Sequence, residues 1–184
     1  MQLHVCKDIA SFPLHKFHQL GSGNGAKLLI VGESPAPNGW VISGKACYRP
    51  DGKLLATGKR LNELLEPLGL SVEQCGFTEL SKCIIDKRSE LQSCSEKCWP
   101  IFLKQLESRE YKVIVVLGVQ MTKILAKLLS IELHMGEIIK MELNGKNYDI
   151  LPIFHPSPIN PTGRAKNREL FGRAYPQLRS LLEK

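Results

Sequence analysis

The sequence contains no long apolar run: no stretch of its 184 residues approaches the roughly 20 apolar residues that cross a bilayer. The first eight residues also lack the apolar core of a secretory signal peptide. No Walker-type Gly-Lys-Ser/Thr loop, no Gly-x-Ser-x-Gly elbow, no internal repeat and no low-complexity linker is present. We therefore expect one domain over residues 1–184, located in the cytoplasm, with no membrane partner.

What is present is an ordinary globular composition with an excess of positive charge. Hydrophobic residues make up 43% and charged residues 23% of the chain, and 25 basic against 18 acidic residues give a net charge of +7. Residues 164–184 contain six basic and two acidic residues, which is +4 of that total. This concentration favours nucleic acid as a partner, although a solvated basic helix face gives the same pattern.

Two short apolar runs predict a parallel sheet that is buried on both faces. They are residues 27–32 and 111–118, and the second leads into a helical pattern over 119–129. The Asn144-Gly145 pair predicts a β-hairpin between 137–143 and 146–154. The pattern as a whole predicts a three-layer α/β/α sandwich with a central, mainly parallel sheet. Three further helices are expected, over about 58–68, from close to Cys98 to 107, and over 165–182. The second begins near Cys98 because Pro100 is tolerated only near a first turn, and Pro176 can interrupt the third.

Two loops leave the predicted strands with residues suited to acid–base chemistry. Glu33 lies in the loop over 32–40, and His155 begins the loop over 155–161, whose three prolines exclude regular structure. In an open α/β sheet, ligands bind beyond the carboxyl ends of the strands. A carboxylate and an imidazole held there on stiff loops suit charge stabilisation or proton transfer, whereas either residue alone is more often solvated or structural.

These two segments carry a resemblance to a known family. Residues 27–35 and 155–161 resemble motifs A and B of the uracil-DNA glycosylase superfamily. Nearly the whole chain follows the order of landmarks in its iron–sulfur (family 4) enzymes, while motif B is closer to the single-strand-selective branch. The resemblance implies a uracil-DNA glycosylase-like fold and a monofunctional DNA glycosylase, which hydrolyses the N-glycosidic bond of a flipped-out deaminated or mismatched base. The further landmarks are 13–16, the helix-like stretch 58–65, Lys82-Cys83, and 98–106.

The resemblance also implies roles for individual residues. His155 would stabilise the anion that collects on the departing base, and Glu33 would position water, with no cofactor needed for this chemistry. Phosphate contacts, or anchoring of the loop itself, are expected from Ser157, Asn160, Arg164, Lys166 and Arg168. The base pocket is expected to include Gly32, Ser34, Pro35, Ala36, Glu79 and, as the stacking aromatic, Tyr48 or alternatively Trp40.

Three residues depart from the family pattern. Ser34 stands where family 1 enzymes have a water-activating Asp, so Glu33 would have to activate the water instead. Ala36 replaces an aromatic residue that excludes the thymine methyl group, which leaves room for a larger base. Glu79 replaces the uracil-reading Asn of family 4: an ionised carboxylate would repel uracil O4, whereas a protonated one would restore the match. We expect weaker or altered uracil selectivity, unless Glu79 is a surface residue in a shifted alignment.

Six cysteines in a cytoplasmic protein argue against disulfides and toward metal binding, catalysis or simple burial. Family 4 enzymes bind a structural [4Fe–4S] cluster, and Cys83 and Cys98 match two of its ligands. Phe12 occupies the place of an N-terminal cysteine, so Cys94 would complete the set with Cys6. Four such thiolates suit a cluster or, alternatively, zinc. The two remaining thiols, Cys47 and Cys75, are expected to be buried.

Two other functions are compatible with the sequence. One is a catalytically weak nucleic-acid-binding member of the same fold, which Ser34 and Glu79 keep open. The other is a small-molecule hydrolase that uses Glu33 and His155, which leaves the basic C-terminal segment unexplained. For the glycosylase itself we expect a monomer, which associates with the nucleoid when it is bound to DNA.

Overall fold

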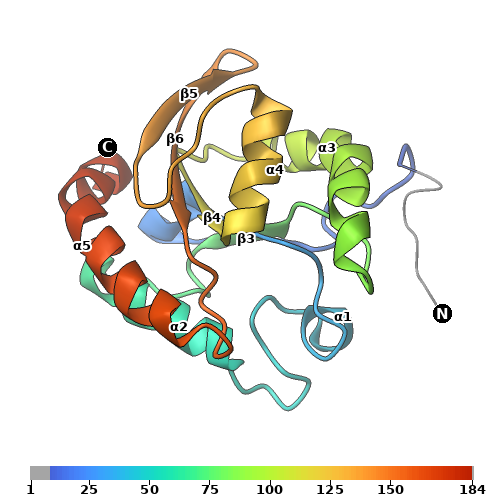
Figure 1. The fold of residues 1–184 in the computed structure, drawn as a ribbon, viewed down its shortest axis with the longest axis horizontal. Coiled ribbons are helices and arrows are strands. Elements are labelled where there is room, and N and C mark those ends of the chain that lie inside the picture. The colour runs from blue at the N-terminus through green and yellow to red at the C-terminus, as the bar shows by residue number, and fades with distance from the viewer. Residues whose placement is uncertain (1–8, 184) are drawn as a thin grey trace.

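The computed structural model describes residues 9–183, which form a six-stranded sheet with helices on both faces (Figure 1). Its spatial order is β1-β3-β2-β4-β6-β5. The four inner strands are parallel to their neighbours, and the edge strands β1 and β5 are antiparallel. The prediction of a mainly parallel sheet in an α/β sandwich is confirmed. The strands are β1 (His18–Gln19), β2 (Leu28–Gly32), β3 (Gly76–Glu79), β4 (Val113–Leu117), β5 (Ile139–Leu143) and β6 (Lys146–Ile153).

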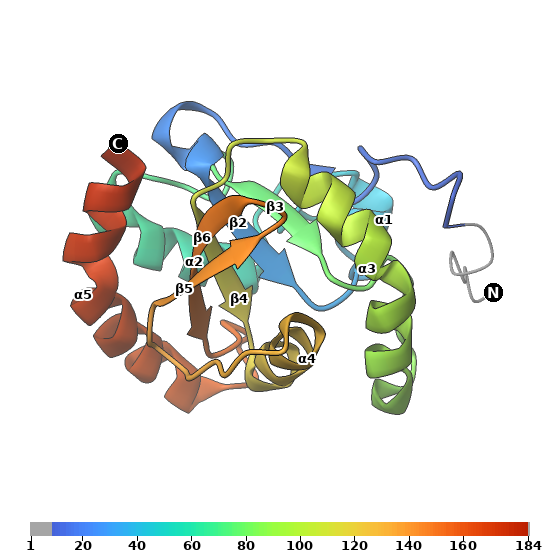
Figure 2. The same ribbon diagram turned by 90° about the horizontal axis from the view of Figure 1, so that it is seen from above.

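Two pairs of long helices cover the two faces of the sheet (Figure 2). One layer consists of α2 (Ala56–Leu65) and α5 (Pro161–Glu183), and the other of α3 (Leu91–Glu107) and α4 (Val119–Leu129). No helix within residues 9–183 is both long and apolar enough to cross a membrane. The single-domain expectation for the full chain stays a prediction. Short helical segments complete the chain: η2 (Gly23–Lys27), α1 (Trp40–Ser43), η3 (Glu66–Leu68) and η4 (Arg88–Glu90).

The alternation of side chains along the central strands builds one hydrophobic core on each face. In β2, Leu28 and Ile30 pack with the α2/α5 layer, while Leu29 and Val31 pack with the α3/α4 layer. Every residue of β2 and β4 is buried because both faces are covered. This burial explains why both strands could be predicted from continuous apolar runs.

The helices that contain proline differ most from the sequence expectation. α3 begins at Leu91 instead of near Cys98, with Pro100 in its interior, and α5 begins at Pro161 and continues through Pro176. An interior proline removes one helical hydrogen bond and crowds the preceding turn. In α3 this local cost is offset by burial of side chains such as Phe102 and Leu106. The predicted hairpin is confirmed, with Asn144 and Gly145 both at positive φ between β5 and β6.

The order of the strands creates a crevice at one edge of the sheet. The chain passes from β2 outward to β3 and then returns across β2 to β4, so the carboxyl ends of β2 and β4 flank a topological switch point. The loops after β2 and β6 both leave the sheet toward the lower part of Figure 1. Any site built from these loops therefore lies at this edge.

Candidate active site

A cavity of about 730 Å³ opens at the carboxyl edge of the parallel strands. Glu33, from the loop after β2, and His155, from the loop after β6, both line it. Its volume lies in the range of small-ligand sites, so a nucleobase fits inside. The structure thus brings together two side chains that are separated by more than half the chain. Further predicted site residues in its wall are Gly32, Ser34, Pro35, Ala36, Glu79, Ser157 and Asn160.

His155 is held against the first turn of α4. Gly118 precedes this helix with a φ of 101°, and a Cβ added there would lie 3.4 Å from the His155 Cβ. Val119 and Gln120 also line the cavity, so the positive end of the helix dipole faces it. Burial, and secondarily the charge of Arg88, lowers the pKa of the His155 imidazole. The ring is therefore neutral at pH 7.

Glu33 is half-buried and forms an ion pair with Arg88, which is much more exposed. Two guanidinium nitrogens donate to the two carboxylate oxygens at 3.1 Å each. Burial raises the pKa of the Glu33 carboxyl, and the Arg88 charge opposes this shift. Arg88 also lines the cavity and donates to the Gln120 side chain at 3.1 Å. Sequence reasoning missed Arg88, because an arginine in a loop carries no signal of its own.

Glu79 is a wall of the cavity and not a surface residue. Its residue exposure is 8%, and it lies beside Gly32 in the β2–β3 register. A Cβ added to Gly32 would lie 2.2 Å from the Glu79 Oε2 atom, which has no hydrogen-bond partner among residues 9–183. Burial raises the pKa of this carboxyl to about 8, although Lys82 lowers it. The Lys82 ammonium donates to the Thr78 hydroxyl at 2.7 Å and to the Glu79 carbonyl.

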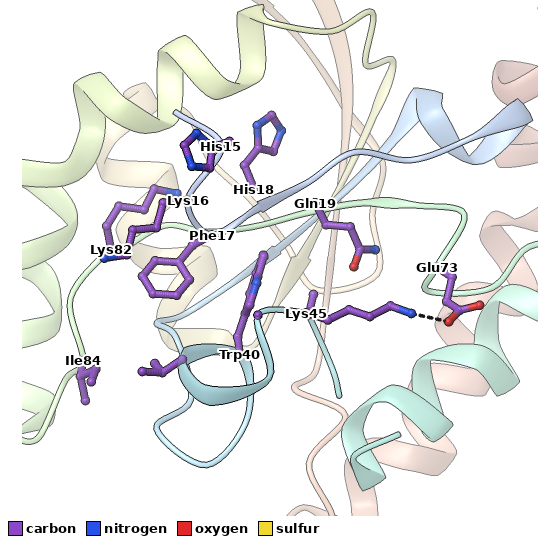
Figure 3. A pocket seen from close by; sticks show the side chains of 13 residues that line it. His15, Lys16, Phe17, His18, Gln19, Trp40, Lys45, Glu73, Lys82 and Ile84 are labelled. Atoms are coloured by element: carbon purple, nitrogen blue, oxygen red, sulfur yellow. Dashed lines mark hydrogen bonds and ion pairs between the residues drawn. The ribbon is translucent and has the colours of Figure 1, made fainter. Parts of the chain in front are cut away.

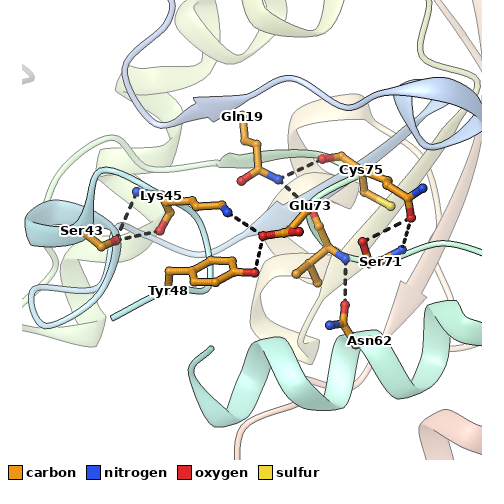
Figure 4. Close-up of polar contacts among 10 residues, drawn as sticks. Gln19, Ser43, Lys45, Tyr48, Asn62, Ser71, Glu73 and Cys75 are labelled. Carbon is orange, nitrogen blue, oxygen red and sulfur yellow. Dashed lines mark hydrogen bonds and ion pairs between the residues drawn. The ribbon is translucent and has the colours of Figure 1, made fainter. Parts of the chain in front are cut away.

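The structure separates the two aromatic residues that were expected as candidates for the cavity. Tyr48 does not line it, because its hydroxyl donates to Glu73 at 2.5 Å in a polar cluster with Lys45 (Figure 4). Trp40 and Phe77 line it instead, packed edge to face with ring centroids 5.6 Å apart. Of the two candidates for the stacking aromatic, the structure therefore favours Trp40.

A second cavity, of about 790 Å³, shares Trp40 with the first one in its wall (Figure 3). Phe17 and Trp40 form its apolar wall, and its charged groups are basic except for Glu73, which pairs with Lys45 at 2.6 Å. Neither Glu33 nor His155 lines this cavity. It therefore lacks the acid–base pair of the first one.

The loop after β6 is fixed at both ends and exposes its centre. Arg60 donates to the Ser157 carbonyl at 2.6 Å, and the Asn160 side chain accepts the Gly163 N–H at 3.0 Å, which caps the start of α5. Ser157 and Asn160 thus anchor the loop, one of the two roles considered for them. Ile159 between them is 90% exposed. Sequence reasoning missed it, although an apolar residue bracketed by prolines is a detectable signal.

The basic residues of α5 are partly neutralised. Arg164 binds Glu63 of α2 with its closest nitrogen–oxygen distance at 2.7 Å, and Arg168 reaches the same carboxylate at 3.3 Å. The Lys166 ammonium lies 5.2 Å from the centre of the Phe154 ring. These three side chains are exposed beside the loop that carries His155, but two of them share one counter-ion.

Three of the four proposed metal ligands are buried, and Cys6 lies outside the described residues. Cys94 and Cys98 are four residues apart on α3, and the Cys98 sulfur accepts the Lys82 backbone N–H at 3.3 Å. Thiolates are the donors that an iron–sulfur cluster uses. Within residues 9–183, however, no three His, Cys, Asp or Glu side chains are grouped so as to hold a metal ion. The described residues alone therefore do not form the site. The other two thiols are Cys75, which is buried, and Cys47, which is half-buried.

Comparison of the sequence with known proteins finds a matching family model and two similar relatives. The sequence model of the uracil DNA glycosylase superfamily matches residues 18–179. A type-4 uracil-DNA glycosylase of Saccharolobus solfataricus is 28% identical over 192 aligned residues, covering 97% of this chain and 84% of the relative. A second type-4 uracil-DNA glycosylase, from Archaeoglobus fulgidus, is also 28% identical, over 76% of this chain and 70% of the relative.

Proposed function

The chain belongs to the uracil DNA glycosylase superfamily, and from this we infer that the cavity of Glu33 and His155 is its active site. The protein is a monofunctional DNA repair glycosylase: it hydrolyses the N-glycosidic bond of uracil, or a related base, in DNA and leaves an abasic site. The observation that carries the assignment of the site is the presence of both side chains in one cavity. The base enters only after it is rotated out of the stack.

His155 is proposed to stabilise the leaving base. As the glycosidic bond breaks, the electron pair stays with the base, and negative charge collects on its O2 atom. A neutral imidazole can donate an N–H to this oxygen, and the start of α4 in the same wall favours an anion. The lowered pKa of His155 means that the ring donates this N–H in its neutral form.

Glu33 is proposed to hold the water that attacks the sugar. The hydroxyl of neighbouring Ser34 is a far poorer base than a carboxylate. Glu33 lies on the opposite loop from His155, and a negative charge there also stabilises the oxocarbenium-like sugar. The water oxygen then bonds to the sugar carbon, one water proton passes by way of Glu33 to solvent, and the base anion takes up a proton from solvent as it leaves.

Glu79 is proposed to read the far edge of the base. A protonated carboxyl offers one donor and one acceptor, which match O4 and N3–H of uracil. The raised pKa of Glu79 and the unpartnered Oε2 atom support this state at neutral pH. A carboxyl can carry its proton on either oxygen, so it fixes the donor pattern less strictly than an amide. Altered selectivity among related bases therefore remains part of the proposal.

Ile159 is proposed to fill the gap that the flipped base leaves in the duplex. It is the most exposed large apolar side chain of the described residues, on a loop that Ser157 and Asn160 anchor. Apolar side chains that insert between base steps act in this way in other DNA-binding proteins. A stiff loop loses little conformational freedom when it inserts.

DNA is the substrate, and α5 is proposed to contact its phosphates. Arg164, Lys166 and Arg168 lie in the first turns of this helix, directly after the loop of His155. Phosphates would compete with Glu63 for the two arginines. We further propose that the protein acts as a monomer in the cytoplasm, associated with the nucleoid when it is bound to DNA.

A structural metal site is proposed at Cys83, Cys94 and Cys98, with Cys6 as the fourth thiolate. The buried thiols of α3 and the burial of Cys83 support it. A [4Fe–4S] cluster fits four thiolates, with zinc as the alternative, and neither takes part in the hydrolysis. Metal analysis of protein prepared without air tests this site. We expect about four iron ions per chain for a cluster, or about one zinc ion for the alternative, and a clearly lower content in Cys98→Ala. Wild-type protein free of both iron and zinc would contradict the site.

An oligonucleotide with one labelled uracil tests the proposed function. We expect wild-type protein to leave an alkali-labile abasic site, and His155→Ala to lose about 10²–10³-fold in single-turnover rate while still binding the DNA. Tight, salt-dependent binding without cleavage by the wild type would instead support the catalytically weak binding protein.

A further inference from the structure

Arg88 occupies an unusual place at the cavity. It comes from η4, on the α3 side of the sheet, and its guanidinium bonds Glu33 of the β2 loop at 3.1 Å twice and Gln120 of α4 at 3.1 Å. A single side chain thus links the loop of the proposed base with the helix that supports His155. A bidentate arginine–carboxylate pair fixes the direction of the carboxylate as well as its charge.

Fold stability does not explain this arrangement. The Arg88 side chain is 69% exposed, and ion pairs of such exposure contribute little to stability. Arg88 therefore acts on the cavity that it lines rather than on the fold.

We propose, resting on the proposed function, that Arg88 is a positioning residue for the hydrolysis, which holds the Glu33 carboxylate ionised and directed at the attacking water. Lysine cannot take over this task fully, because its ammonium lacks the planar fork.

The electrostatics of the surrounding groups agree with this role. Burial raises the pKa of Glu33, and Arg88 is the charge that counters it. Two other titratable groups face the pair. Glu79 comes from β3, and besides burial, the Glu33 charge raises its pKa while the Lys82 charge lowers it. His155 comes from the loop after β6, and besides burial, the Arg88 charge lowers its pKa. Arg88 thus favours a charged base and a neutral imidazole, the two states that the reaction needs.

The test compares Arg88→Gln and Arg88→Lys with Arg173→Gln, which removes an equally exposed ion-paired arginine from α5. Single-turnover uracil release is measured from pH 5 to 9 with saturating protein. We expect Arg88→Gln to lower the rate at pH 7 at least about tenfold and to move the acid limb up by about one pH unit, because Glu33 loses its counter-charge. Arg88→Lys restores the position of the limb but not the full rate, and Arg173→Gln resembles the wild type.

Two outcomes would overturn the proposal. If Arg88→Gln weakens DNA binding but leaves the saturated rate and the acid limb unchanged, Arg88 is only a phosphate contact. If the carboxyl carbon of Glu33, followed by NMR in the free protein, titrates at the same pH in wild type and Arg88→Gln, Arg88 does not hold it ionised. The NMR titration requires no activity, so it separates failure of this proposal from failure of the proposed function.

Discussion

At the scale of single residues, burial controls the ionisation of the cavity more than neighbouring charges do. Desolvation is the largest cause of the pKa shifts of Glu33, Glu79 and His155. Each shift favours the uncharged form, because the charged form loses contact with water. At Glu33, the Arg88 charge opposes this effect, which favours a carboxylate there beside a neutral carboxyl at Glu79 and a neutral imidazole at His155.

The protonated state of Glu79 leads to a pH-dependence prediction. Uracil release by the wild type should fall about tenfold per pH unit above pH 8, because the neutral carboxyl that matches uracil is lost. Glu79→Gln should keep its rate in this range, since an amide donates and accepts at any pH. The measurement is single-turnover release from pH 6 to 9.5. An identical alkaline decline in both proteins would refute the role of Glu79.

The sequence could predict the residues at strand ends but not those that loops bring in. Glu33 and His155 follow predicted strands whose carboxyl ends meet at one edge, whereas Glu79, the last residue of β3, was expected in the pocket only from the family resemblance. Arg88 lies several residues beyond β3, and its position depends on how that loop packs. Tyr48 was wrongly placed in the base pocket, because the loop before α2 folds toward Glu73.

At the scale of elements, the close contact between β2 and β3 shapes the end of the base cavity. Gly32→Ala would place a methyl group 2.2 Å from the present position of the Glu79 Oε2 atom and force the carboxyl into the cavity. We expect the free energy of unfolding to fall by about 1–3 kcal/mol, and we expect uracil release to be lost. Gly172→Ala is the control, since its Cβ meets nothing within 4 Å and alanine is favoured in helix α5. Urea unfolding of both variants checks this, and an unchanged Gly32→Ala contradicts the packing.

The loop after β6 gives a second prediction at this scale. Ile159→Ala should slow uracil release from duplex DNA about tenfold and leave single-stranded DNA unaffected, because only a duplex has a stack to fill. Ile42→Ala removes another exposed isoleucine, 65% exposed on α1, and should change neither substrate. Equal slowing on both substrates by Ile159→Ala would mean that the residue supports the loop and does not enter the duplex.

Elements with strong periodic patterns were predictable, and those dependent on tertiary contacts were not. Helix α4 has the predicted bounds of 119–129, and β2 and β4 lie within the predicted runs. β3 has four residues, including a glycine and a glutamate, and its pairing depends on β1 and β2, which lie on either side of it. The start of α3 was predicted too late, because Pro100 locally indicates a first helical turn. The helix extends back to Leu91 because its apolar face is buried against the rest of the protein, which the local sequence does not reveal.

At the scale of the whole molecule, part of the excess positive charge is paired with carboxylates in the free protein and can bind phosphates when DNA is present. Glu63 pairs with both Arg164 and Arg168 in the free protein. Glu63→Gln should release both arginines, tighten DNA binding and steepen its salt dependence. Glu96→Gln makes the same charge change where Glu96 pairs with Lys127, so it is the matched control. The DNA affinities of both variants are measured between about 50 and 200 mM salt, and the slope of log affinity against log salt concentration is compared. Equal slopes for the two variants would show that α5 is not part of the DNA interface.

The central claim is that one cavity places a nucleobase between His155 and Glu33. A crystal structure with free uracil bound tests it most directly. The account predicts uracil in the cavity at the carboxyl edge of β2 and β4, with O2 toward His155 and the N3–O4 edge toward Glu79. Uracil bound instead in the second cavity, against Phe17 and away from both side chains, would contradict it.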